Sequence, residues 1–209
     1  MSADHTVNSV LPDEPEKATL EGKNKVLGFW LFLGGETILF GTLFATFIAL
    51  RNQTNGGPTG HELFELPLTA AATVILLVSS MTSVMSVLAM HQHNLKKMQV
   101  WLTITAILGI AFLALEIYEF SHYVAEGHKM SSSAFGSAFY TLVGFHGGHV
   151  LFGVLWLITL QLQAIKKGLT VVTAPKFYVF SLYWHFVDLV WVFIFTVVYL
   201  MSIVGGKVG

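Results

Sequence analysis

The chain of 209 residues carries 11 basic and 12 acidic side chains, a formal net charge of -1, and no cysteine. Apolar residues make up 54% of it and charged residues only 11%, a balance that indicates a membrane protein rather than a soluble domain. The lack of cysteine excludes disulfides, thiolate metal sites and thiol catalysis, and the near-zero net charge gives no basic patch for nucleic acid.

Residues 1–25 form the first segment, which is polar and acidic. It has neither a basic n-region nor an apolar h-region, so it does not resemble a cleaved signal peptide. We expect a short polar tail, exposed to solvent, on the cytoplasmic side.

Five apolar runs follow, each close to or longer than the 20 or so residues that a helix needs to cross a bilayer. They cover residues 26–50, 66–91, 98–120, 135–165 and 177–204. Because only helices satisfy their own backbone in lipid and no alternating pattern indicates a barrel, we expect an all-α fold. The prediction is a polytopic membrane protein with one transmembrane domain of five helices at 26–204 and a C-terminal tail at 205–209.

Basic residues are unevenly distributed between the two ends of this bundle. The side of the N-terminus carries Lys17, Lys23, Lys25, Lys96, Lys97, Lys166, Lys167 and Lys176. The opposite side carries Arg51, Lys129 and Lys207. Since lysine and arginine accumulate in short cytoplasmic loops, we expect the N-terminus in the cytoplasm and the C-terminus outside. The loop at 51–67 is the longest expected connection, and its glycines and prolines favour an ordered or partner-contacting turn region.

Ionisable side chains also fall inside the predicted spans, where a charge costs on the order of 2.5 to 3.5 kcal/mol on insertion scales. They are Glu36, Glu116, Glu119, His146, His149, His185 and Asp188. A helix rises about 1.5 Å per residue, which places four of them at a similar depth in the membrane and allows one polar layer. These four are Glu36, His149, His185 and Asp188. The two glutamates of the third span lie nearer its outer end. For the carboxylates, a buried neutral or histidine-paired acid and a proton-relay group both stay open.

Two ligand-binding alternatives involve the histidines. Glu116, Glu119 and His122 recur every three residues along one helical face, as in carboxylate-bridged di-metal bundles, but no other span supplies the matching Glu-x-x-His. His149 and His185 are candidate haem ligands from two facing helices. We favour interhelical hydrogen bonds for these histidines and expect no metal ligands.

The stretch GFHGGHV at 144–150 combines two histidines with closely spaced glycines. Gly144 and Gly148 form a small-xxx-small face, with Gly147 and Gly153 beside it, which lets another helix come close. The first span offers a matching small surface at Gly34, Gly35 and Gly41. The pattern therefore predicts a helix contact rather than a ligand pair.

Several motifs, taken in chain order, resemble subunit III of the haem-copper terminal oxidases. They are GFWLFLGGETILF (28–40), FELPL (64–68), LEIYEFSHY (115–123), GFHGGHV (144–150) and SLYWHFVDLVWVFIFTVVYL (181–200). The resemblance covers nearly everything from Glu21 onward, and the length is similar to the short bacterial form with five helices. The N-terminal region and the TAPKFYVFSLYWHFVDLVW segment are most similar to cytochrome c oxidases of the caa3 and aa3 kinds.

The resemblance implies an accessory, multi-pass subunit of a proton-pumping oxidase in the bacterial plasma membrane. Such a subunit carries no cofactor and no catalytic residue, because haem and copper lie in partner subunits. It docks on subunit I, beside subunit II and a small subunit IV, and it meets cytochrome c only indirectly. It stabilises subunit I, supports proton uptake and holds phospholipid between its helices. A quinol oxidase subunit III shares the same motifs and is the alternative function; a haem-binding membrane anchor is the second.

The resemblance also implies two groups of site residues. Glu36 matches the family's buried, carbodiimide-reactive carboxylate and is grouped with other buried polar, proton-related positions: His149, His185 and Asp188. The structural or lipid-cleft group comprises Glu116, Glu119, His122, His146 and Trp184.

Overall fold

The computed structural model describes residues 11–54, 66–125, 127–128 and 130–202. The first ten residues, most of the 51–67 loop, Lys129, Lys207 and the predicted tail at 205–209 lie outside the described residues. Five helices in the described part are long and apolar enough to cross a membrane. They are α1 (Leu20–Leu50), α3 (Leu66–His91), α4 (Leu95–Ala125), α5 (Ala134–Lys167) and α6 (Ala174–Ile194), which continues as a π-helical turn, η2 (Phe195–Leu200).

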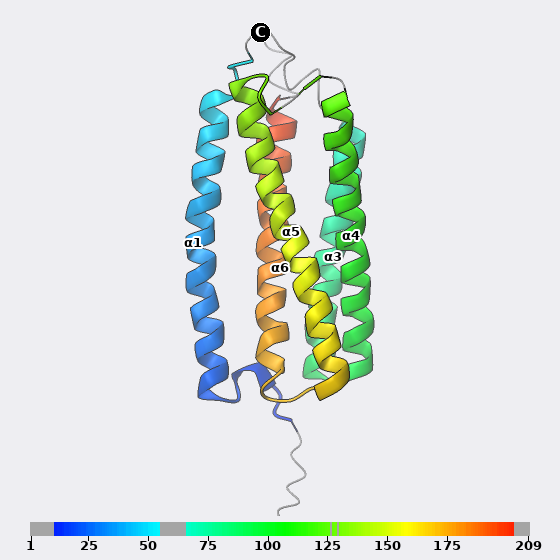
Figure 1. Cartoon of the computed structure of the whole chain (residues 1–209). Coiled ribbons are helices and arrows are strands. Elements are labelled where there is room, and N and C mark those ends of the chain that lie inside the picture. The colour runs from blue at the N-terminus through cyan, green and yellow to red at the C-terminus, as the bar shows by residue number, and fades with distance from the viewer. Residues whose placement is uncertain (1–10, 55–65, 126, 129, 203–209) are drawn as a thin grey trace, which may run out of the picture.

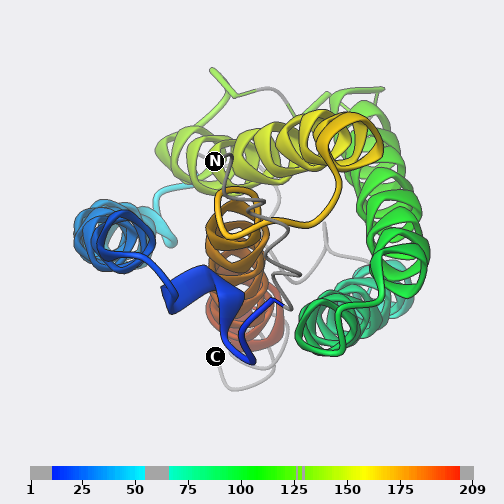
Figure 2. The same cartoon turned by 90° about the horizontal axis from the view of Figure 1, so that it is seen from below.

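The five helices run side by side, with the chain passing up and down between the two ends of the bundle (Figure 1). We call the end at which α1 and α6 begin the lower end, and the opposite end the upper end. Seen from below, α6 lies in the middle, the α3–α4 pair and α5 flank it, and α1 stands at the edge (Figure 2). The main packing partners of α1 are accordingly α5 and α6.

The large aromatic side chains of α6 form much of the core. Trp184 and Trp191 are almost completely buried, as is Tyr183. The indole of Trp184 fits between two glycines on neighbouring helices: a Cβ at Gly109 of α4 would come 2.8 Å from this ring, and a Cβ at Gly153 of α5 would do the same. These two glycines therefore set how closely α4 and α5 approach α6.

The other glycines contradict part of the predicted helix contact. A Cβ at Gly148 would meet nothing within 4 Å, and the same holds for the first-span glycines: Gly34, Gly35 and Gly41. Gly144 makes only an ordinary contact with Phe120. The close approach occurs instead at Gly147, whose missing side chain makes room for the Glu116 carboxyl group, and at Gly153. The contact face of α5 is thus rotated from the one expected.

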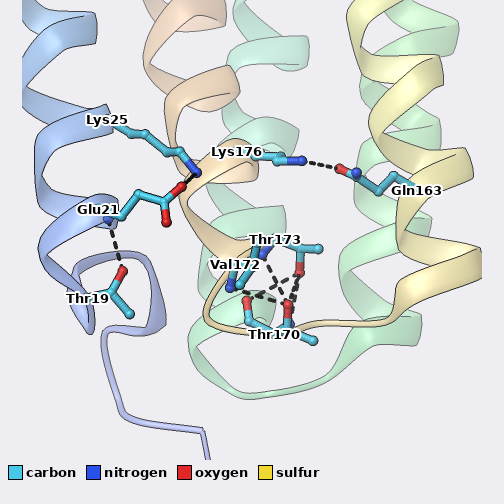
Figure 3. A network of polar contacts seen from close by, with 9 residues as sticks. Thr19, Glu21, Lys25, Gln163, Thr170, Val172, Thr173 and Lys176 are labelled. Atoms are coloured by element: carbon cyan, nitrogen blue, oxygen red, sulfur yellow. Dashed lines mark hydrogen bonds and ion pairs between the residues drawn. The ribbon is translucent and has the colours of Figure 1, made fainter.

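Capping and short polar contacts organise the lower end (Figure 3). The Thr19 hydroxyl accepts a hydrogen bond from the Gly22 amide, at 3.0 Å, so α1 begins at Leu20, before the apolar run predicted from residue 26. Lys176 of α6 donates to the Gln163 side chain of α5, at 3.1 Å. These contacts extend the helices beyond their apolar runs and join their ends.

Residues 11–19 pack against the lower end, although the sequence predicts a solvated tail there. The short 3-10 helix η1 (Pro15–Lys17) crosses beneath α6 (Figure 2). Glu16 is only 1% exposed, and its Oε2 lies 3.2 Å from His91 Nε2 at the end of α3. His93 Nε2 donates to the Pro12 carbonyl, at 3.1 Å. The segment thus connects the start of α1 to the end of α3.

We predict that Gly153→Ala destabilises the bundle, because the new methyl group must displace the Trp184 ring from a packed site. Overpacking of this kind costs about 1–3 kcal/mol. Gly148→Ala, on the same helix but facing open space, is the matched control and should leave stability within about 0.5 kcal/mol. Thermal unfolding of the purified complex in detergent measures both. Equal melting temperatures for the two variants would show that the close packing of Trp184 on Gly153 does not contribute to stability.

Candidate functional site

Glu36 and His149 form a polar contact between α1 and α5. Glu36 Oε2 lies 3.2 Å from His149 Nε2, and each side chain keeps 16% of its surface exposed. The other ring nitrogen, Nδ1, lies 2.8 Å from the Phe145 carbonyl oxygen, and the Tyr183 hydroxyl donates to the His149 carbonyl, at 2.9 Å. The ring of Phe40 packs edge-on against His149, with centroids 5.1 Å apart. The histidine is therefore fixed on several sides.

The hydrogen bonds limit where protons sit in this pair. Because a carbonyl oxygen only accepts, Nδ1 of His149 must carry a proton. A hydrogen bond between Nε2 and Glu36 then needs either a neutral acid that donates to a neutral imidazole, or a carboxylate that accepts from an imidazolium. Both arrangements hold the same number of protons. The pair can shift one proton between α1 and α5 without any change in its net charge.

His185 and Asp188 lie on α6 and face α3. His185 Nδ1 is 2.7 Å from the Ser80 hydroxyl oxygen, and its Nε2 is 3.4 Å from that of Ser181. Asp188 is 5% exposed, and the Ser80 hydroxyl lies near its carboxyl group. Neither carboxyl oxygen of Asp188 has a hydrogen-bond partner of good geometry among the described residues.

Glu116 and His146 are buried where α4 meets α5. The Glu116 carboxyl group fills the space left by Gly147, and its Oε2 has no hydrogen-bond partner among the residues that the structure describes. His146 is completely buried between the rings of Phe112 and Trp191, with centroid distances of 5.9 and 5.2 Å. Within the same described residues, neither ring nitrogen of His146 has a hydrogen-bond partner. Aromatic packing holds this histidine in place.

Glu119 accepts hydrogen bonds from three hydroxyl groups near the upper end. Tyr123 donates to its Oε1 at 2.6 Å, and Thr69 of α3 donates to the same oxygen at 3.4 Å. Tyr199 of η2 donates to Oε2 at 3.1 Å. One buried carboxyl group thereby joins α3, α4 and the end of α6.

Two further predicted site residues occupy different surroundings. Trp184 is buried, and its Nε1 donates to the Ser79 hydroxyl, at 2.7 Å. His122 lies on the exposed side of α4, with its ring nearly parallel to that of Tyr118, at an interplanar angle of 3°. Trp184 thus serves the core, whereas His122 lies at the bundle surface.

The predicted polar layer is divided into two separate contacts. Glu36 and His149 connect α1 to α5, whereas His185 and Asp188 connect α6 to α3. The two candidate haem ligands are hydrogen-bonded to different helices. For the di-metal alternative, the described residues contain no group of three or more metal-ligating side chains of the histidine, aspartate and glutamate type.

Open grooves border α1 on both sides. The groove between α1 and α6 has a volume of about 620 Å³. Its lining is almost entirely apolar, and His185 is one of the few polar residues in it. A smaller groove of about 370 Å³ lies between α1 and α5, where Phe32, Phe152 and His149 contribute to its walls. The polar pair of α1 and α5 therefore borders an open groove between these two helices.

The hydroxyl side chains of α3 were not identified from the sequence. They are Thr73, Ser79, Ser80 and Ser83, which are hydrogen-bonded to Trp191, Trp184, His185 and Ser181 of α6. A signal was present, because these residues interrupt an otherwise apolar run at helical spacing. Tyr123 and Tyr199 were missed in the same way, since tyrosines in a membrane span are commonly assigned to packing or to the interface.

Comparison with known proteins places these features in a family. The family model described as cytochrome c oxidase subunit III matches residues 14–203. The chain is 63% identical over 195 residues to cytochrome c oxidase subunit 3 of Bacillus sp. (strain PS3). This alignment covers 93% of this chain and 94% of that protein. It is 62% identical over 195 residues to the protein of the same description in Bacillus subtilis (strain 168), with the same coverage.

A second group of relatives is more distant. Quinol oxidase subunit 3 of Bacillus spizizenii is 48% identical over 198 residues, or 95% of this chain and 96% of that protein. The family match spans the five membrane-spanning helices and the polar contacts of the candidate site. The chain therefore belongs to the cytochrome c oxidase subunit III family, as a multi-pass membrane subunit of a bacterial haem-copper terminal oxidase.

Proposed function

We propose that this chain is the accessory subunit III of a proton-pumping cytochrome c oxidase and carries no catalytic centre of its own. The observation that supports this most directly is that several of its ionisable side chains are hydrogen-bonded between helices. Glu36 is paired with His149, His185 with Ser80, and Glu119 with hydroxyl groups, so that each joins two helices. Haem and copper belong to the partner subunits in this proposal.

The difference in identity supports cytochrome c rather than quinol as the donor of the complex. The cytochrome c oxidase relatives are 63% and 62% identical, compared with 48% for the quinol oxidase relative. Because donor chemistry resides in other subunits, this support comes from overall similarity and not from a donor site in this chain. A quinol oxidase is the alternative complex.

The lower end of the bundle is the cytoplasmic end in this proposal. Lys23, Lys25, Lys96, Lys97, Lys166, Lys167 and Lys176 gather there. Lysine in short loops favours the cytoplasmic side. The N-terminal segment then lies in the cytoplasm, and η2 approaches the outer surface.

Partners and lipid complete the proposal. Subunit I is the main contact, with subunit II and a small subunit IV in the same complex. Phospholipid acyl chains fit the apolar groove between α1 and α6, whose volume of about 620 Å³ is comparable to that of small-molecule sites. We assign Glu36, His149, His185 and Asp188 to proton-related positions, and the remaining buried polar residues to structural roles.

Mass spectrometry of the intact complex tests this function. We expect the chain to co-purify with subunits I, II and IV and with bound phospholipid. Purification as a stable, active transporter without oxidase subunits would overturn the proposal. An absorption spectrum of the isolated chain tests the haem-anchor alternative, since a stoichiometric Soret band that disappears in His149→Ala would favour that alternative.

Glu36→Gln should leave the assembled complex active. We expect its rate of oxygen consumption to change by less than about two-fold, because the side chain touches none of the reacting atoms. Oxygen-electrode assays on purified complexes of equal subunit content measure this, with His149→Gln as the control that alters the other member of the pair. Complete loss of oxygen consumption in an assembled Glu36→Gln complex would contradict the accessory role.

Tyr123→Phe tests the structural role of the upper-end cluster around Glu119. Removal of the 2.6 Å hydrogen bond to a buried carboxyl group should lower the free energy of unfolding by about 1–3 kcal/mol. Tyr118→Phe on the same helix is the control, because Tyr118 is 60% exposed. Thermal denaturation of the complex compares the two variants, and a Tyr123→Phe complex as stable as the control would show that the cluster has no structural role.

A further inference from the structure

Asp188 is the buried acid whose hydrogen bonds are least complete. It is 5% exposed, in the middle of α6, and both of its carboxyl oxygens are without a hydrogen-bond partner among the described residues. An unpaired polar group in an apolar interior costs several kcal/mol. A charge there costs more, which favours the neutral form of the acid. A further hydrogen-bonding group beside Asp188 would therefore stabilise the folded protein.

Ser80 is the polar group beside this acid, and it is already engaged with His185. The Ser80 oxygen and His185 Nδ1 are 2.7 Å apart, and the hydroxyl also lies near the Asp188 carboxyl group. His185 in turn lines the groove between α1 and α6. The three side chains thus form a row that leads from this groove, through α3, to the buried acid.

The hydrogen-bonding capacity of Ser80 is too small to complete the row alone. Its hydroxyl has one proton, which goes either to His185 or toward Asp188. Even in the second case, at least one carboxyl oxygen of Asp188 remains unpaired. A water molecule supplies two donors and two acceptors and commonly satisfies buried polar groups of this kind.

Two other buried side chains have a polar atom without a hydrogen-bond partner among the described residues, and their surroundings differ from those of Asp188. Glu116 fills the space over Gly147, and His146 is enclosed by the rings of Phe112 and Trp191. Each is closely packed against another helix. Beside Asp188, by contrast, α3 presents the Ser80 hydroxyl, which also contacts His185.

We propose that Asp188 and Ser80 bind an internal water molecule, and that this water and His185 connect the Asp188 proton to the groove between α1 and α6. The acid passes its proton to the water while the water passes one of its own protons to the Ser80 oxygen, Ser80 passes its hydroxyl proton to Nδ1 of His185, and Nε2 of His185 releases a proton to water in the groove. The reverse sequence, in which water in the groove supplies the proton, restores the neutral acid. The ligand of the site is water, and its activity is proton exchange. This inference goes beyond the proposed function, which does not require it.

Infrared spectroscopy of the purified oxidase complex tests the route. The carbonyl band of the Asp188 acid is identified as the band that Asp188→Asn removes, and its shift after transfer to D₂O reports proton exchange. We expect exchange in Ser80→Ala to be slower by about ten-fold or more, since loss of one bridging hydrogen bond raises the barrier by about 1.4 kcal/mol. His185→Phe interrupts the other end of the row and should also slow the D₂O-induced shift of this band.

Thr82→Val is the control for Ser80→Ala. Thr82 also lies on α3, and its hydroxyl pairs with that of Thr105 of α4, at 2.8 Å. This variant should exchange at the wild-type rate. Equal exchange rates in Ser80→Ala, His185→Phe and Thr82→Val would overturn the proposal, as would the absence of an acid band that depends on Asp188.

A density map of the same complex, at a resolution that shows ordered water, tests the ligand itself. We expect density for one water within hydrogen-bond distance of both Asp188 and Ser80. A direct contact between the two side chains with no water beside them would overturn the assignment. Both experiments use the assembled complex, so either can fail while the chain still behaves as an accessory oxidase subunit.

Discussion

The hydrogen bonds between α3 and α6 are the interactions on which the rest of the bundle depends. Helix α6 carries two tryptophans, a histidine and a serine through an apolar layer that offers them no water, and α3 supplies a hydroxyl for each. With these groups satisfied, α6 can occupy the centre of the bundle (Figure 2). The other helices then pack on its aromatic side chains, with glycines at the points of closest approach.

Helix α1 is attached in a different way. Its contacts with the bundle combine one polar pair, Glu36 and His149, with ring contacts such as those of Phe40 and Phe47, and grooves border it on either side. The central helix is thus held by several hydrogen bonds to α3, and the peripheral helix mainly by aromatic packing and one polar pair. The polar pair places a partly exposed carboxyl group at this edge.

The sequence predicts the five helices, the all-α class and the family, because long apolar runs and unusual motifs are local features. It does not predict which residues meet. Consecutive residues on a helix point about 100° apart, so the difference between Gly147 and Gly148 as a contact is invisible in composition. Likewise, Glu36 and Asp188 were expected in one polar layer from their similar depth, but depth does not specify the partner helix. Serine and threonine in α3 were overlooked because each is individually unremarkable in a membrane span.

Helix α1 is also joined to the bundle through residues 11–19. Because Glu16 contacts His91 and Pro12 contacts His93, the start of α1 is tied to the end of α3, across the base of α6. These two helices lie on opposite sides of α6, so residues 11–19 connect them beneath the central helix. The lower end of α1 is therefore held through α3, with which the helix itself has few contacts, as well as by its own packing on α5 and α6.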